Sequence, residues 1–306
     1  MTEAAEDIDV SELEEIERTA VELATLAGAE IQAALGSMIA VRYKGESPDK
    51  TLWRDPVSEI DQRVETLIRS RVAERFPGHD VIGEEMVERP GRAHDCVWIV
   101  DPIDGTTNFV NGFPMFAASI GVLRRGRPVV GAVWCSTGHA LRPGVYHASA
   151  GSKLRFEDND VTPKLNPAVR RRLAGVPVVT ANDKNWETRK TGSAAIECAL
   201  IATGMLRVAR FDSPNIWDVA GGIVLVKAAG GTVRQQRDGH WETMQSFVPE
   251  QPSVGGEADL RFWQHPLIVG APEAVERMCA SQAGERRSHF APGSHHSAGS
   301  TCRADE

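Results

Sequence analysis

The chain has 306 residues, enough for one large domain or two closely joined subdomains, and its 42% hydrophobic and 25% charged residues exclude a disordered or fibrous protein. The formal net charge of −8 argues against nucleic acid as a partner, because an acidic surface repels a phosphate backbone. The same charge would repel a small phosphorylated molecule unless cations or helix termini reversed the potential locally, so a bound metal is expected.

The first third of the chain predicts two helices joined by a loop. Apolar residues recur at helical spacing from Val10 to Leu35, with acidic residues in the first turns. The polar, proline-containing residues 44–56 predict a loop with a short strand on either side. A second helix is expected to begin after Ser58 as its N-cap, with Asp61 in the capping position three residues later.

Four apolar runs bounded by turn residues follow, and each predicts a strand of one sheet. They cover residues 80–82, 96–100, 117–123 and 128–134. Because the runs follow closely on one another, we expect antiparallel pairing rather than helical crossovers.

After the polar stretch 151–163 the pattern changes to strands alternating with helices, which favours a smaller α/β unit. Strands are predicted at 176–180 and 207–211, helices at 193–204 and 216–231, and further core segments at GTVRQ, PLIVGAP and AVERM. We therefore expect an α+β subdomain at 1–150, an α/β subdomain at 151–280, and a disordered tail at 281–306, where the sequence is polar and aperiodic.

The cysteines and the amino terminus predict a cytoplasmic protein without membrane contact. The five cysteines are scattered and never form a CxxC pair, which is typical of reduced thiols. The acidic start MTEAAEDIDVSELEE lacks the basic and apolar regions of a secretory signal, and no apolar run reaches transmembrane length.

The segment DPIDGTTNF at 101–109 carries the strongest chemical signal. The strand before it delivers Asp101 and Asp104 to one small volume, with Pro102 between them expected to stop the strand. Two uncompensated carboxylates so close would repel each other, and a bridging hard cation such as Mg2+ removes that cost. The carbonyl of Ile103 offers one more oxygen ligand.

The residues directly after these acids favour phosphate binding. Gly105, Thr106 and Thr107 suit a turn into a helix whose first N–H groups face outward, and such a helix start binds phosphate. A structural alternative stays open, in which Asp104 caps the helix and Asp101 is a turn residue.

Three further acids have both a structural and a functional interpretation. Glu84 or Glu85 follows a predicted strand, and either joins the same cluster or forms a solvated turn. Asp218 begins an apolar helix, where it also stabilises the helix dipole, and Asp61 is already explained by capping. None of these acids identifies a site alone.

Together these segments resemble the inositol monophosphatase family of Mg2+-dependent, lithium-sensitive phosphatases. The resemblance is carried by GEE at 83–85, WIVDPIDGTTNFVNGFP at 98–114 and WDVAGG at 217–222, and it extends from about Leu23 to Ala274. It implies a layered α-β-α-β-α sandwich, which agrees with the antiparallel half and the α/β half predicted above. It also implies a homodimer.

The resemblance further implies a role for each matching residue. The implied ligands of two or three Mg2+ ions are Glu84, Asp101, the Ile103 carbonyl, Asp104 and Asp218. The implied catalytic residues are Glu84 and Thr106, which orient the attacking water, and Asp61, beside a more weakly held ion. The implied substrate contacts are the N–H groups of Gly105, Thr106 and Thr107 for the phosphate, and Gly192, Ser193 and Ala194 for the organic part.

The resemblance implies hydrolysis of a small phosphate monoester by metal-activated water, but it leaves the substrate open. Phe211 stands where inositol-hydrolysing members usually carry a glutamate that binds a sugar hydroxyl. Either the site lacks this acceptor, or Phe211 packs in the core and Asp212 binds the sugar. Histidinol phosphate, a 3′-nucleotide, and a non-catalytic scaffold that retains the fold stay open as alternatives.

Overall fold

The computed structural model describes residues 9–37, 40–43, 56–86, 95–163, 166–179, 183–247 and 260–289. Residues 44–55 of the predicted loop lie outside these ranges. The predicted flanking strands are present as the antiparallel pair β1, Val41–Tyr43, and β2, Pro56–Ser58. In the described part of the chain, no helix is both long enough and apolar enough to cross a bilayer.

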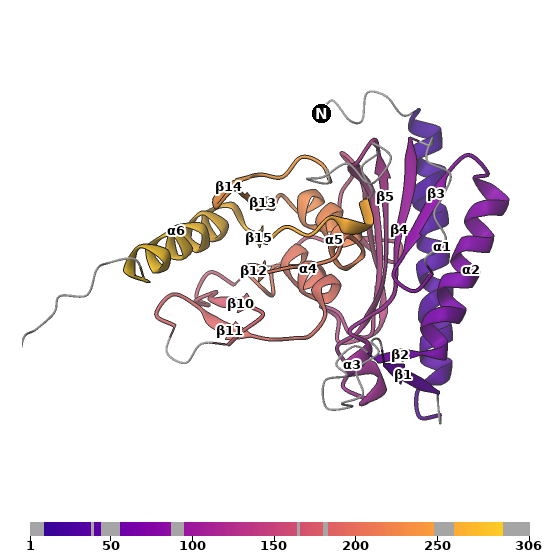
Figure 1. Ribbon diagram of the computed structural model, residues 1–306, viewed down its shortest axis with the longest axis horizontal. Helices are drawn as coiled ribbons and strands as arrows, with labels where there is room; N and C mark the ends of the chain where they lie inside the picture. The colour runs from indigo at the N-terminus through magenta and orange to yellow at the C-terminus, as the bar shows by residue number, and fades with distance from the viewer. Residues whose placement is uncertain are drawn as a thin grey trace, which may run out of the picture.

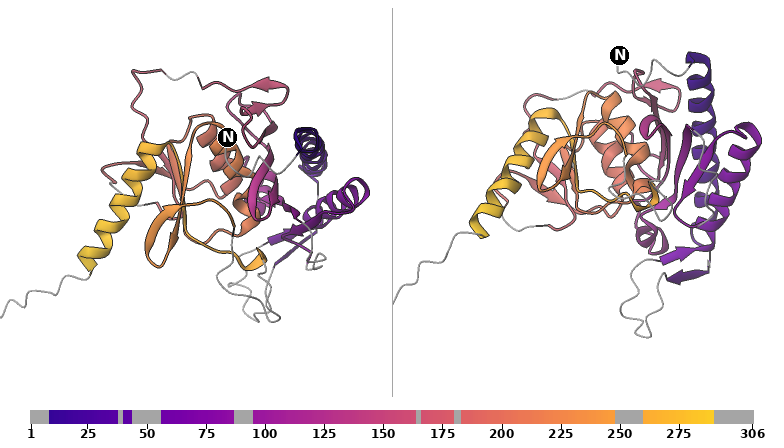
Figure 2. Two further views of the ribbon diagram at one scale, coloured as in Figure 1. Left: turned by 90° about the horizontal axis from the view of Figure 1, so that it is seen from above. Right: turned by 45° about the horizontal axis from the view of Figure 1, so that its top comes forward.

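Helices and sheets alternate in five layers, which confirms the predicted sandwich (Figures 1 and 2). Helices α1, Val10–Ala34, and α2, Glu59–Arg75, cover the outer face of the first sheet. Helices α4, Ala194–Ala202, and α5, Ile216–Ala228, lie between the two sheets. Helix α6, Pro272–His289, covers the second sheet.

The first sheet has seven strands in the order β3-β4-β5-β6-β7-β8-β9. They are β3 Asp80–Gly83, β4 Cys96–Asp104, β5 Ala117–Arg124, β6 Arg127–Cys135, β7 Gly144–Ser149, β8 Arg155–Phe156 and β9 Asn159–Asp160. The predicted antiparallel pairing is confirmed from β4 to β6. Strands β7, β8 and β9, which were not predicted, continue the antiparallel order past residue 150.

Strand β3 departs from this pattern because it runs parallel to β4, with Gly83 beside Val100. The carboxyl ends of parallel strands lie at the same edge of a sheet. Residue 84, which follows β3, therefore lies next to Asp101 on β4. The Glu84 N–H donates to the Val100 carbonyl at 3.2 Å, which continues the pairing by one residue.

The prediction that Pro102 stops strand β4 is wrong. The strand continues to Asp104, and its register against β5 shifts between Asp101 and Asp104. Proline lacks an N–H group, so it interrupts the hydrogen-bond ladder at one position without ending the strand. The irregularity leaves both carboxylates at the same end of the sheet. A five-residue helix, α3 Thr106–Val110, follows directly.

The second sheet has the order β11-β10-β12-β15-β13-β14. Its strands are β10 Leu173–Gly175, β11 Glu187–Arg189, β12 Val208–Phe211, β13 Thr232–Arg237, β14 His240–Thr243 and β15 Leu267–Gly270. The strand predicted at 176–180 is wrong in its described part, because β10 ends at Gly175. Pro177 has no N–H for a ladder, and Val178 and Val179 are exposed.

The C-terminal part differs from the predicted tail at its start. Helix α6 continues past Ser281 to His289, so a disordered tail beginning at 281 is wrong for these residues. The polar stretch is rich in Gln, Ala, Glu and Arg, which are strong helix formers, and they extend the helix. Residues 290–306 lie outside the described ranges. The short 3-10 turn η2, Leu260–Phe262, precedes β15.

Helix α5 packs against the first sheet through three glycines. A Cβ atom on Gly131 of β6 would lie 2.2 Å from the Gly221 carbonyl oxygen, and one on Gly121 of β5 would lie 2.7 Å from the Gly221 nitrogen. A Cβ on Gly221 itself would meet the Ile120 carbonyl oxygen at 2.9 Å. Because no side chain fits between helix and sheet, backbone meets backbone here. This contact fixes the start of α5 beside the end of β4.

Candidate active site

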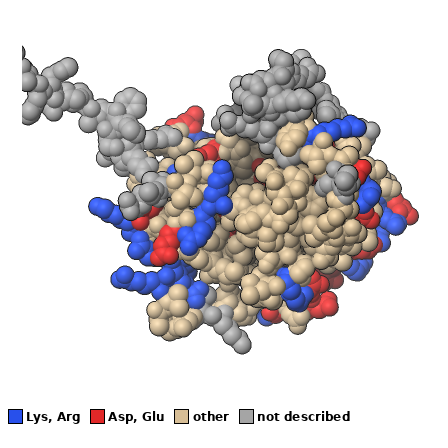
Figure 3. Space-filling view, turned by 90° about the horizontal axis from the view of Figure 1, so that it is seen from below, with Lys and Arg blue, Asp and Glu red and all other residues tan. Residues whose placement is uncertain are grey.

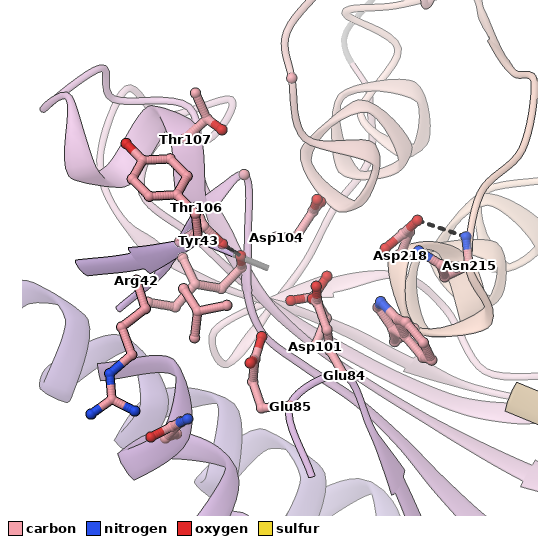
Figure 4. A pocket seen from close by; sticks show the side chains of 16 residues that line it. Arg42, Tyr43, Glu84, Glu85, Asp101, Asp104, Thr106, Thr107, Asn215 and Asp218 are labelled. Carbon is pink, nitrogen blue, oxygen red and sulfur yellow. Dashed lines mark hydrogen bonds between the residues drawn. The ribbon is translucent and has the colours of Figure 1, made fainter. Parts of the chain in front are cut away.

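Five acidic residues from both halves of the chain, including the neighbours Glu84 and Glu85, line one cavity of about 700 Å3 (Figure 4). Asp101 and Asp104 lie at the end of β4, Glu84 follows β3, and Asp218 lies in the first turn of α5. The cavity is lined by Arg42, Tyr43, Val57, Gln62, Glu84, Glu85, Asp101, Ile103, Asp104, Gly105, Thr106, Thr107, Gly192, Asn215, Trp217 and Asp218. Both Glu84 and Glu85 are in this wall, so the choice between them stays open on position alone.

Asp101 is a buried carboxyl surrounded by other acids. Its residue is 2% exposed, and its Oδ1 atom is buried with no hydrogen-bond partner in the described part of the chain. Burial raises the pKa of this carboxyl well above its usual value, and the neighbouring charges of Glu84 and Asp104 raise it further. A buried carboxylate oxygen without a donor is costly unless a cation takes that place.

Asp104 connects the two halves of the molecule. Its Oδ2 atom accepts hydrogen bonds of 2.6 Å from the Ser193 hydroxyl and the Ala195 N–H, at the start of α4. Burial raises the pKa of Asp104 to about 6, although these two hydrogen bonds lower it. Asp104 is therefore a capping residue, as the structural alternative predicted, but of α4 rather than of the helix that follows it.

Asp61 forms the predicted capping box of α2. Its Oδ2 atom accepts from the Ser58 N–H at 2.8 Å and from the Ser58 hydroxyl at 2.5 Å. Its other oxygen, Oδ1, lies 3.3 Å from the Thr106 hydroxyl. Burial raises the pKa of Asp61 to about 6. The same carboxylate therefore caps the helix with one oxygen and contacts Thr106, a residue of the cavity wall, with the other, although Asp61 itself does not line the cavity.

The turn after Asp104 depends on a glycine. Gly105 has a φ of 88°, and a Cβ atom there would lie 3.0 Å from the Met115 carbonyl and 3.1 Å from the Gly192 carbonyl. The turn starts α3, whose first N–H groups have no acceptor within the helix. The Thr106 hydroxyl lies 2.9 Å from the Ile103 carbonyl oxygen. Residues 105–107 thus line the cavity at the start of this helix.

Asp218 lines the cavity and also accepts a hydrogen bond at the start of its own helix. The Asn215 N–H donates to its Oδ2 atom at 2.7 Å, a capping contact of α5 that was not predicted, since only an interaction with the helix dipole was expected (Figure 4). Its neighbour Trp217 lines the cavity, and sequence reasoning missed it. The motif WDVAGG could have suggested it, because Trp217 directly precedes an expected ligand. Nothing in the sequence pointed to Arg42 and Tyr43, which reach the cavity from β1.

The predicted residues for the organic part of the substrate are only partly brought together. Gly192 lines the cavity, whereas Ser193 and Ala194 lie behind it, where Ser193 holds Asp104. Phe211 is 9% exposed and belongs to the core between the sheets, as one of the two alternatives predicted. Asp212 is exposed, pairs with Arg210 at 2.9 Å, and is not part of the cavity wall.

A second group of ligand-type side chains lies at the other end of β4. Glu12, His79 and Cys96 place ligand atoms within 4.8 Å of one another. The Trp98 indole N–H donates to His79 Nδ1 at 3.1 Å, so the proton of a neutral ring is on Nε2, the nitrogen that faces Glu12. This arrangement is a hydrogen-bonded packing contact.

The raised pKa values predict a pH-dependent response to metal. The pKa of Asp61 and of Asp104 is raised from 3.8 to about 6 in the folded, metal-free protein. Between pH 4 and 6 these two carboxyls therefore hold protons in the folded protein and have lost them in the unfolded chain. The free energy of unfolding without metal therefore falls as pH rises through this window. We expect added Mg2+ to raise the melting temperature much more at pH 7.5 than at pH 5, measured by calorimetry against EDTA-treated protein. Equal shifts at the two pH values would contradict this.

Comparison with known proteins identifies the family to which this sequence is similar. The sequence model of the inositol monophosphatase family matches residues 12–268. The fructose-1,6-bisphosphatase/inositol-1-monophosphatase of Aquifex aeolicus is 31% identical over 201 residues, covering 62% of this chain and 76% of that protein. The Nus factor SuhB of Salmonella typhimurium is 32% identical over 276 residues, covering 82% and 92%. The crystal structure of the extragenic suppressor protein suhB from Bartonella henselae has a TM-score of 0.68 at 23% identity, covering 87% and 97%, and shares the fold.

Proposed function

This chain belongs to the inositol monophosphatase family and is a phosphoric monoester hydrolase, and we propose that it hydrolyses a small phosphate monoester with the help of Mg2+. The observation that carries the proposal is the buried Oδ1 atom of Asp101, which has no hydrogen-bond partner in the described part of the chain and lies at a cavity lined by four other carboxylates. A cation there would neutralise this group, and it would also offset the repulsion between this acidic protein and a phosphate.

The donor set around Asp101 fits Mg2+. It consists of oxygens only, which hard cations prefer, and the cavity leaves room for water ligands. We propose that two or three ions are held by Glu84, Asp101, the Ile103 carbonyl, Asp104 and Asp218, with Asp61 near the most weakly held one. When bound, Mg2+ would lower the pKa of a water ligand and neutralise the negative charge that develops on the leaving oxygen.

The chain's own residues would orient the attacking water and hold the phosphate. The Thr106 hydroxyl has two acceptors in reach, the Ile103 carbonyl at 2.9 Å and Asp61 Oδ1 at 3.3 Å, and donates to one of them at a time. When it donates to Asp61 it can accept from the attacking water, which Glu84 would hold from the other side. Asp61 would receive the proton of that water through Thr106. The N–H groups of residues 105–107 would receive the phosphate oxygens.

Thr106→Val should lower kcat by about 100-fold with a small change in KM, because valine keeps the shape but removes the hydroxyl that links water to Asp61. Phosphate release at saturating Mg2+ measures both constants. As a matched control, Thr66→Val removes a hydroxyl that donates to the Gln62 carbonyl on the exposed side of α2. A Thr106→Val enzyme with the wild-type kcat would rule out this role.

The substrate class can be tested with a panel of monoesters. The panel should contain an inositol phosphate, histidinol phosphate, a 3′-nucleotide and a sugar phosphate, each assayed with Mg2+ and with EDTA. We expect Mg2+-dependent release from at least one member. With Phe211 in the core and Asp212 outside the cavity wall, polyol discrimination would depend on Arg42, Tyr43 and Trp217. No release from any substrate would favour the non-catalytic scaffold.

We also propose a cytoplasmic homodimer. The cysteines Cys96, Cys135, Cys198 and Cys279 are all free and buried, which suits a reducing compartment. Viewed from below, the wide middle of the molecule carries few charged side chains and so suits a self-contact (Figure 3). Sedimentation of the purified protein tests the dimer.

A further inference from the structure

Arg261 makes an unusual set of contacts for a residue outside the motifs. It lies on the short turn η2, far along the chain from the acidic loop after β3. Its Nη1 atom donates to the Gly83 carbonyl at 2.7 Å and to the Met86 carbonyl at 2.9 Å, and its Nη2 atom donates to the Glu84 carbonyl at 3.2 Å. One guanidinium group therefore binds three carbonyls of the loop that carries Glu84.

The other side of this loop is held from helix α2. The buried Glu65 carboxylate accepts from the Glu85 N–H at 2.7 Å and from the Met86 N–H at 3.1 Å. Arg69 pairs with Glu65 at 2.8 Å. The Glu85 and Met86 amides thus face α2, and Arg261 binds the loop carbonyls, of which that of Met86 also accepts from Arg69 Nη2 at 3.3 Å. The backbone around Glu84 is therefore held from two sides.

Arg261 also contacts the segment that carries Asp218. The guanidinium carbon lies 5.3 Å from the centre of the Trp217 ring, in a cation–π arrangement. Trp217 directly precedes Asp218 and lines the cavity. The side chain of Arg261 therefore bridges two segments from different halves of the protein, one carrying Glu84 and Glu85 and the other Asp218, and all three carboxylates line the cavity.

We propose that Arg261 is a positioning residue that sets the separation of Glu84 and Asp218 around the bound cation. The inference rests on the proposed function, because it takes these two acids as Mg2+ ligands. Arginine suits the task because its planar group can bind several carbonyls and stack on an indole at the same time, which the lysine ammonium cannot. Groups that orient metal ligands typically change metal affinity by roughly 10- to 100-fold when removed.

The test is direct Mg2+ binding by Arg261→Lys and Arg261→Ala, measured by calorimetry on metal-free protein without substrate. We expect the Kd for Mg2+ to rise roughly 10- to 100-fold. The Mg2+ concentration for half-maximal phosphate release should rise with it, and kcat should recover at saturating Mg2+. If Arg261→Ala does not fold, Arg261→Lys, which keeps the charge and the side-chain stem, gives the result.

A matched control separates positioning from general packing. Arg277 of α6 stacks on Trp186 with its guanidinium carbon 5.8 Å from the ring centre, outside the cavity wall. Arg277→Ala should leave Mg2+ binding unchanged. If the Arg261 variants bind Mg2+ like the wild type and lose only melting temperature in EDTA, the inference is overturned and the proposed function stands. If the wild type binds no Mg2+, the proposed function itself fails, and this inference with it.

Discussion

Replacing Asp104 with asparagine should lower Mg2+-dependent phosphate release by at least roughly 1,000-fold and leave the fold intact, a loss of about 4 kcal/mol of transition-state stabilisation. Asp104 is expected to act through its charge, which draws the cation into the cavity together with Asp101. Asparagine has nearly the same shape and no charge, so it separates the electrostatic role from the packing role.

The hydrogen bonds of Asp104 explain why the fold should survive. Its Oδ2 atom accepts from the Ser193 hydroxyl and the Ala195 N–H. The asparagine oxygen can take this position and keep both bonds, because the Ala195 N–H cannot face an amide NH2 group. The NH2 group of the asparagine must then point toward the expected cation. The variant thus keeps the cap of α4 and presents a donor where the metal needs an acceptor.

Steady-state phosphate release and circular dichroism measure the two parts of this prediction. Asp160→Asn is the matched control, because Asp160 lies exposed on β9 and pairs with Lys153 outside the cavity wall. We expect it to retain full activity. An Asp104→Asn protein that turns over at the wild-type rate would overturn the assignment of Asp104 as a ligand.

Replacing Gly131 with alanine should destabilise the protein by about 3 kcal/mol, at the upper end of the usual cost of overpacking. The new Cβ atom would lie 2.2 Å from the Gly221 carbonyl oxygen of α5. That oxygen belongs to the backbone, so no change of rotamer can relieve the clash, and α5 must move away from the sheet. Since Asp218 lies on α5, we also expect weaker Mg2+ binding.

Denaturation by urea in EDTA gives the change in the free energy of unfolding without the contribution of metal. Gly78→Ala is a suitable control, because a Cβ atom there meets nothing within 4 Å and the residue does not have a positive φ. It should stay within about 0.5 kcal/mol of the wild type. If Gly131→Ala and Gly78→Ala have the same free energy of unfolding, the close approach of α5 to the sheet does not contribute to stability.

The acidic cluster could be anticipated from the sequence because its main signals are local. A strand followed by DPID, and a carboxylate at the start of an apolar helix, both place acids at the ends of elements. The parallel pairing of β3 with β4 was not predicted, since the order of the runs favoured antiparallel neighbours. That pairing is what puts Glu84 beside Asp101. The residues alone left Glu84 or Glu85 as either a member of the cluster or a solvated turn, and the family resemblance favoured Glu84.

Contacts between distant segments could not be found from local patterns. The sequence marked Ser193 and Ala194 as a helix start but gave no sign that this start holds Asp104. Arg261 lies in no motif, and its three carbonyl acceptors are visible only once the halves are assembled. The predicted strand ends near Pro102 and Pro177 were wrong. Strand β4 continues through Pro102 despite its missing N–H, whereas β10 ends at Gly175, before Pro177.

The division of the acids between β4 and α5 has a consequence during protein synthesis. Glu84, Asp101 and Asp104 leave the ribosome well before Asp218, and before Ser193 and Ala195 can hold Asp104 in place. A nascent chain that ends before α5 has the first sheet but lacks the last carboxylate and the helix that packs on Gly121 and Gly131. Its ability to capture Mg2+ should therefore appear late in translation, once α5 has joined the sheet.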